Sequence, residues 1–157
     1  MDLDERIPMT TSERTAWIAA VLTPATVVGY LVVVAPQLAS TPVDRLGWQA
    51  PMLWSMGINF VGTIVLTILA TIVAGIGAGI RHEELDTSSD QRDRDIDRHG
   101  GRVALSISAA GLLAVLVLAM LELDAFWIGN AAFVVGAIGA TAGSIAQIAA
   151  YRGTFRG

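Results

Sequence analysis

Four long apolar stretches divide the chain, at residues 16–35, 52–80, 103–121 and 125–151, and none of them contains a charged residue or a histidine. A helix that crosses the hydrocarbon core of a bilayer needs about 20 consecutive apolar residues, and each stretch is about that long or longer. A membrane β-barrel has roughly ten-residue alternating segments instead. We therefore expect an all-α, four-helix transmembrane bundle that contacts the lipid bilayer and forms one integral membrane domain over residues 1–157.

Arginine positions predict how the four spans are oriented. Nine of the ten basic residues precede the first span, lie between the second and third, or follow the fourth, whereas the first loop has only Arg45. Cytoplasmic segments carry the excess of Arg and Lys. We therefore expect both termini and the charged loop 81–102 to be cytoplasmic, in a plasma or inner membrane. The first 15 residues are more acidic than basic, unlike a signal peptide, so we expect the first span to be retained.

Aromatic side chains stand near the ends of the predicted spans. Indole and phenol rings prefer the depth of the lipid headgroups, because they combine an apolar body with a polar group. We interpret five of them as interfacial anchors: Trp17, Trp48, Trp54, Trp127 and Tyr151.

The second span carries an uncharged polar residue at every fourth position, namely Ser55, Asn59, Thr63, Thr67 and Thr71. Such a row forms a ridge along a helix, and small hydroxylic residues favour close packing and hydrogen bonds between helices in lipid. The alternative is a water-accessible polar track. Each step of four overshoots a full turn by about 40°, which favours the packing ridge. The fourth span offers Asn130 and Gln147 to face it.

Two pairs of glycines have the GxxxG spacing, Gly75 with Gly79 and Gly139 with Gly143. This spacing lets two helix backbones approach closely in a membrane. The pairs therefore predict a helix-packing face, and we expect the protein to be a homo-oligomer.

The loop 81–102 alternates acidic and basic residues. Ser88 and Gln91 have the spacing of a capping box, which predicts a helix from near Ser89, and Gly100-Gly101 predicts a hinge before the third span. Two interpretations stay open: a solvated helix that orients the protein, or a docking face for a cytoplasmic protein partner. The docking residues would be Asp90, Arg92, Asp93, Arg94, Asp97 and Arg98.

Residues 90–98 read Asp-Gln-Arg-Asp-Arg-Asp-Ile-Asp-Arg, and Tyr151-Arg152 stands near the end of the chain. This segment resembles the DERD-x-x-I segment of a family of uncharacterised prokaryotic four-helix membrane proteins, in which a Tyr-Arg pair also closes the chain. Gln91 stands where the family pattern has Glu. The resemblance covers mainly residues 88–157 and implies the four-helix architecture, with no activity attached.

Candidate chemistry is sparse. No ionisable residue lies within a span, where a proton-coupled transporter or membrane enzyme would usually need one. The chain has no cysteine, hence no thiolate ligand or nucleophile, and it has no basic block that would bind nucleic acid. The acids and histidines of the loop match no metal-site spacing: His82, Glu83, Glu84, Asp86 and His99. We expect no catalytic residue, cofactor or metal.

These observations predict a non-enzymatic membrane protein that acts through helix packing and oligomerisation, with a partner docking on the cytoplasmic loop. The alternative is a small oligomeric channel or transporter whose polar track follows the second span. A membrane enzyme, the third hypothesis, would depend on Glu122, Asp124 or the acids of the loop.

Overall fold

A computed structural model describes residues 9–81 and 91–154, and it confirms an all-α, four-helix protein. The four long helices are α1 (Thr11–Leu38), α2 (Gln49–Arg81), α3 (Gln91–Met120) and α4 (Ala125–Ala149). A short 3-10 helix, η1 (Val43–Arg45), lies between α1 and α2, and one π-helical turn, η2 (Ala150–Thr154), follows α4. All four long helices are long and apolar enough to cross a membrane.

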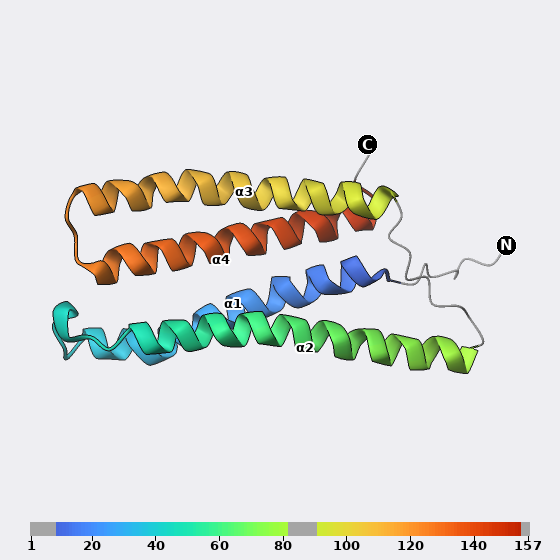
Figure 1. Cartoon of the computed structure of the whole chain (residues 1–157), viewed down its shortest axis with the longest axis horizontal. Coiled ribbons are helices and arrows are strands. Elements are labelled where there is room, and N and C mark those ends of the chain that lie inside the picture. The colour runs from blue at the N-terminus through green and yellow to red at the C-terminus, as the bar shows by residue number, and fades with distance from the viewer. Residues whose placement is uncertain (1–8, 82–90, 155–157) are drawn as a thin grey trace.

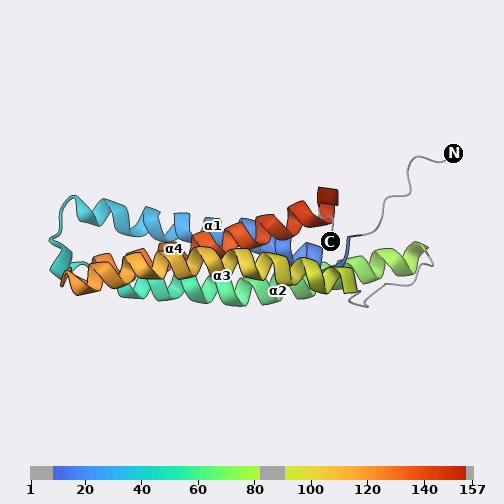
Figure 2. The ribbon, with the colours of Figure 1, turned by 90° about the horizontal axis from the view of Figure 1, so that it is seen from above.

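In Figure 1 the helices follow one another from top to bottom in the order α3, α4, α1, α2, and Figure 2 shows that all four run along the same long axis. The main contacts join α3 to α4, α4 to α1, and α1 to α2. Two helical hairpins therefore meet along a seam between the first and the last long helix. We call the end where α1 begins and α4 finishes the terminal end, and the opposite end, with residues 39–48 and 121–124, the loop end (Figure 1).

Helix boundaries extend beyond the apolar stretches. α1 begins at Thr11 because the Thr10 hydroxyl accepts a hydrogen bond from the Glu13 amide at 3.2 Å, which satisfies one of the free amides of the first turn. α1 also continues through Pro24 and Pro36 to Leu38. The helix thus enters the expected first loop before it ends.

The predicted hinge at Gly100-Gly101 is wrong, since α3 runs without a break from Gln91 to Met120. Gly100 is buried, and a β-carbon there would come within 2.8 Å of the Gly143 carbonyl oxygen. The glycine therefore serves close approach between α3 and α4 rather than bending of the chain.

The glycine pair at 139 and 143 lies at this same contact. A β-carbon on Gly139 would come within 3.0 Å of the Ala104 carbonyl oxygen, and one on Gly143 within 2.8 Å of the Gly100 carbonyl oxygen. The missing side chains let α3 and α4 approach closely, as expected for GxxxG surfaces. This pair therefore packs against α3 of the same chain.

α3 and α4 are joined by a tight turn and form a helical hairpin. α3 ends at Met120 and α4 begins at Ala125, and Glu122 between them takes a left-handed conformation with φ of 55°. A non-glycine residue seldom adopts this conformation, but single residues do so in tight turns.

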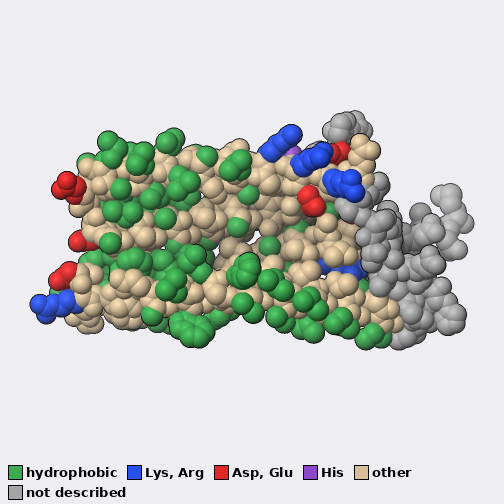
Figure 3. All heavy atoms as spheres, in the orientation of Figure 1, with side chains coloured by type: hydrophobic (Ala, Val, Ile, Leu, Met, Phe, Trp, Pro, Cys, Tyr) green, Lys and Arg blue, Asp and Glu red, His purple; other side chains and the backbone are tan. Residues whose placement is uncertain are grey.

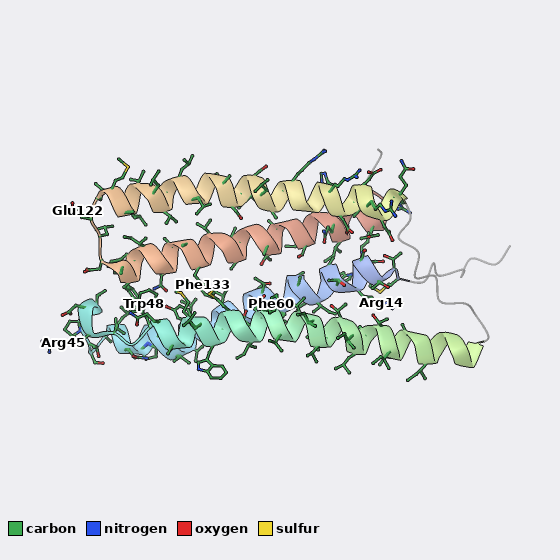
Figure 4. The ribbon with its side chains drawn as sticks, in the orientation of Figure 1. Arg14, Arg45, Trp48, Phe60, Glu122 and Phe133 are labelled. Atoms are coloured by element: carbon green, nitrogen blue, oxygen red, sulfur yellow. The ribbon has the colours of Figure 1, made fainter. Side chains whose placement is uncertain are left out.

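A hydrophobic cluster closes the loop end. Its buried members come from α1, α2, α4 and the connection between α1 and α2: Tyr30, Val34, Leu46, Met52 and Phe126. The Trp48 ring packs edge-on against Phe126 at 5.9 Å, and Phe133 packs against Tyr30 at 5.3 Å. Trp48 and Phe133 are labelled in Figure 4, with Arg45 and Glu122 at the same end of the molecule.

Candidate functional site

Polar side chains of α1 and α2 meet in the half of the bundle nearer the loop end. The Ser55 hydroxyl donates a hydrogen bond to the Thr26 carbonyl oxygen at 2.8 Å. The Asn59 amide nitrogen lies 3.2 Å from the Thr23 hydroxyl oxygen and 3.1 Å from that of Thr26, and donates to both. Ser55 and Asn59 therefore join α2 to α1 through three hydrogen bonds.

The rest of the polar row bonds within α2. Thr63 donates to the Asn59 carbonyl oxygen and Thr71 to the Thr67 carbonyl oxygen, each at 2.8 Å. The hydroxyl of Thr67 is buried and has no hydrogen-bond partner among the described residues. Along α2, the hydrogen bonds of the row therefore change from bonds with another helix to bonds within the same helix.

Ser55 and Asn59 of the row hydrogen-bond to α1, whereas the sequence suggested that the row would face the fourth span. Asn130 of α4 instead accepts a hydrogen bond from the Tyr30 hydroxyl at 2.6 Å and donates to the Phe126 carbonyl oxygen at 2.8 Å. Thr23, Thr26 and Tyr30 were not among the residues predicted from the sequence. Their spacing of three and then four residues was the available signal, because it places all three on one face of a helix.

A cavity of about 280 Å³ lies beside these side chains, between α1, α2 and α4. Thr23, Thr26 and Asn59 supply its polar wall, and small residues of α4 such as Gly136 and Ala140 supply the opposite wall. Asn59 therefore contributes its amide group to this wall. Figure 3 shows the molecule hollowed between the two hairpins near its middle.

The expected docking residues face in two directions. Arg92, Arg94 and Arg98 are exposed, and Arg98 forms an ion pair with Asp95 at 3.4 Å. Asp93 instead is 6% exposed, within the bundle. Asp97 accepts a hydrogen bond from the Ser12 hydroxyl of α1 at 3.4 Å. Asp90 lies outside the described residues.

Asp97 precedes the apolar stretch of α3. Partial burial raises the pKa of its carboxyl group, the hydrogen bond from Ser12 lowers it, and the nearby Asp93 carboxylate raises it; the net shift is upward. Burial away from water disfavours the charged form of a carboxyl group.

The two segments that carry the family resemblance meet at the terminal end. Ile96 is completely buried, and Tyr151 lies near Asp93, Thr10 and Ser12. The guanidinium of Arg152 lies 5.0 Å from the ring centre of Trp17, within the range of a cation–π interaction.

The five aromatic residues expected as anchors lie at the two ends. Trp54 and Trp127 are exposed, while Trp48 packs into the loop-end cluster. Trp17 and Tyr151 are half-buried at the terminal end. Trp48 therefore packs against other helices as well as standing near a predicted membrane surface.

Within residues 9–81 and 91–154, no group of three or more His, Asp or Glu side chains is arranged to hold a metal ion. Of the residues considered for a metal site, only His99 lies in the described part of the chain. Comparison with protein-family models, curated proteins and solved structures found no match to this chain.

Proposed function

We propose that the protein is a non-enzymatic, multi-pass membrane protein that spans a plasma or inner membrane four times and acts by assembling with copies of itself. Large apolar side chains are exposed along all four helices, where water would be a poor solvent and lipid a good one. Asp, Glu and Arg side chains gather toward the two ends (Figure 3). The terminal end, with its excess of arginine, is the cytoplasmic end in this proposal.

The observation that carries the assembly is the open arrangement of the helices. α2 and α3 stand at the two edges, and no residue in the most apolar stretch of either is buried inside the chain. Helices in a membrane gain stability from packing against other helices. We propose that α2 of one copy packs against α2 of the next.

Disulfide trapping tests this assembly, because the chain has no native cysteine. Ile68 of α2 is 54% exposed and Val134 of α4 is 37% exposed. Ile68→Cys should form a cross-linked dimer in membranes on mild oxidation, and the matched control Val134→Cys should not. A monomeric mass in several detergents, with no cross-link from any exposed position of α2, would contradict the proposal.

The orientation has a separate test. A membrane-impermeant thiol reagent should label Leu123→Cys in intact cells, because the loop end would face outward. The same reagent should label Arg94→Cys only after the membrane is permeabilised. The reverse pattern would contradict the proposed orientation without affecting the assembly.

The outward-facing arginines of α3 support a second part of the proposal, a cytoplasmic protein partner. Arg92, Arg94 and Arg98 are exposed, and a basic surface attracts an acidic partner. If so, replacing the three arginines with Gln should release the partner from affinity-purified protein, while the Asp95→Asn control retains it. Equal recovery from both variants would contradict this part.

The cavity between α1, α2 and α4, which we call the central cavity, favours a second candidate function. This is an oligomeric channel or transporter that uses the polar row of α2. Three polar side chains line the cavity, and an uncharged path of this kind suits water or a small polar solute. Thr67→Cys tests it through labelling by a small impermeant thiol reagent in intact cells. Rapid labelling would favour transport, and protection with full labelling after denaturation would favour dry packing.

A further inference from the structure

A second cavity, of about 310 Å³, lies at the terminal end between α1, α3 and α4. α1 supplies Thr11, Ser12 and Thr15 together with two alanines, α3 supplies Asp97, and α4 supplies Gln147. The other detected grooves between the helices have almost wholly apolar walls, apart from the central cavity. Of these four spaces between the described helices, it is the one with a carboxylate in its wall.

Hydrogen bonds within the wall determine which groups the hydroxyls of Ser12 and Thr15 can still bind. The Ser12 hydroxyl donates its hydrogen to Asp97, and the Thr15 hydroxyl donates its hydrogen to the Thr11 carbonyl oxygen at 3.0 Å. A hydroxyl has one hydrogen and two lone pairs. Once their hydrogens are used, Ser12 and Thr15 offer only acceptors to the cavity, beside the carboxylate of Asp97.

The one charged side chain among the residues that line the cavity is Asp97. Asp93 is buried one helical turn before Asp97, and no arginine or histidine is among the residues that line the cavity. Arg14 donates to the Met9 carbonyl oxygen, and the Arg152 guanidinium lies over the Trp17 ring. Arg98, which follows Asp97 in the chain, pairs with Asp95 at 3.4 Å, so these three arginines have other partners.

The cavity has room for an organic group beside the carboxylate of Asp97. A water molecule occupies about 30 Å³ in the liquid, so the space is far larger than a bare metal ion requires. Ala16 and Ala19 add an apolar part to the wall. We propose that this cavity binds a primary ammonium group, whose N–H bonds donate to Asp97, Ser12 and Thr15 while its first carbons contact the alanines.

Two sources can supply this group, a soluble alkylamine and the ethanolamine headgroup of a bilayer lipid. Trp17 and Tyr151 lie at the same end of the bundle, and such rings prefer the depth of lipid headgroups. Only the lipid source rests on the proposed membrane location. Binding of a soluble amine is independent of it and of oligomerisation.

Saturation-transfer NMR tests the proposal on the full-length protein in phosphatidylcholine nanodiscs at pH 7. Ethylammonium should bind, and tetramethylammonium, which has the same charge and no N–H bond, should bind at least tenfold more weakly. Asp97→Asn should weaken ethylammonium binding at least tenfold, and Ser12→Ala should weaken it severalfold. Asp95→Asn is the matched control, because Asp95 lies on the same helix outside the cavity wall, and it should change binding less than twofold.

A parallel titration in nanodiscs containing phosphatidylethanolamine distinguishes the two sources. Loss of ethylammonium binding there would identify the lipid headgroup as the occupant, and unchanged binding would identify a soluble amine. Absence of ethylammonium binding to the wild-type protein in phosphatidylcholine would overturn the proposal. So would equal affinity for tetramethylammonium, a comparison that needs no variant. Equal losses in Asp97→Asn and Asp95→Asn would overturn it as well.

Discussion

The Tyr30 hydroxyl donates a 2.6 Å hydrogen bond to the Asn130 amide oxygen, and the two residues are 100 positions apart in the chain. Tyr30 is 2% exposed. This bond crosses the seam between α1 and α4 and therefore ties one hairpin to the other.

Tyr30→Phe should destabilise the fold by about 1–2 kcal/mol, because it leaves the partly buried amide oxygen of Asn130 without its donor. A double-mutant cycle with Asn130→Ala should give a coupling energy of about 0.6–1.7 kcal/mol, the range for hydrogen bonds between membrane helices. Unfolding in mixed micelles measures both values. A cycle with zero coupling would show that the bond adds nothing to the seam.

Asn59→Leu should separate α2 from α1 more easily, since it removes both hydrogen bonds to Thr23 and Thr26. We expect a loss of about 1–2 kcal/mol in unfolding free energy. Thr63→Val is the matched control on the same helix, because Thr63 bonds only to its own backbone; it should cost less than about 0.5 kcal/mol. Equal effects of the two changes would show that the bonds between α1 and α2 are not special.

Gly143→Ala should loosen the contact between α3 and α4. A β-carbon there would lie 2.8 Å from both the Gly100 carbonyl oxygen and the Ala104 β-carbon, and overpacking of this kind costs about 1–3 kcal/mol. Gly136→Ala is the control, since its β-carbon would have no atom within 4 Å, and it should be neutral or stabilising. Thermal unfolding of both variants in one detergent tests the contrast.

Asp97→Asn should make the ligand-free protein slightly more stable at pH 7. The pKa of Asp97 is raised in the folded state, so the folded state holds this proton more tightly than the unfolded state does. The contribution of the group to stability therefore falls as pH rises through the interval between the unfolded and the folded pKa. The gain should be below about 1 kcal/mol, because Asp97 is only partly buried and the hydrogen bond from Ser12 offsets part of the cost of burial.

The gain from Asp97→Asn should disappear at a pH below the unfolded pKa of about 3.9, where Asp97 is protonated in both states. Melting curves of wild type and variant from pH 3 to pH 8 measure it. A gain that persists unchanged at pH 3 would show that charge is not its cause.

The hydrophobic pattern predicted the four helices because each apolar stretch is long and continuous. It did not predict their neighbours. Ser55 and Asn59 needed a polar partner, but periodicity within one helix does not identify which other helix supplies it. The choice between α1 and α4 depended on Thr23 and Thr26, which supply the acceptors for Ser55 and Asn59. Their spacing places both on one helix face, but α4 also carries polar residues such as Asn130, so the spacing does not decide between the two helices.

The glycines also show that a local sequence pattern does not predict contacts between helices. Gly100-Gly101 favours a bend by local propensity, yet Gly100 lies at a contact that only packing with α4 explains. The charged segment likewise predicted a solvated surface. Burial of Asp93 and Ile96 follows from the position of α1 and α4, which the local pattern of charges does not contain.

The order of the helices along the chain determines when α1 and α4 can pack during translation. α1 is made early, but α4, which covers one of its faces, is the last long helix to be made. At about 5–20 residues per second, the 100 residues that separate Tyr30 from Asn130 take about 5–20 s to translate. During that interval Tyr30 is not yet covered by α4 and contacts the surroundings of the nascent chain. The rate of translation, rather than the rate of helix packing, therefore limits when the two hairpins can associate.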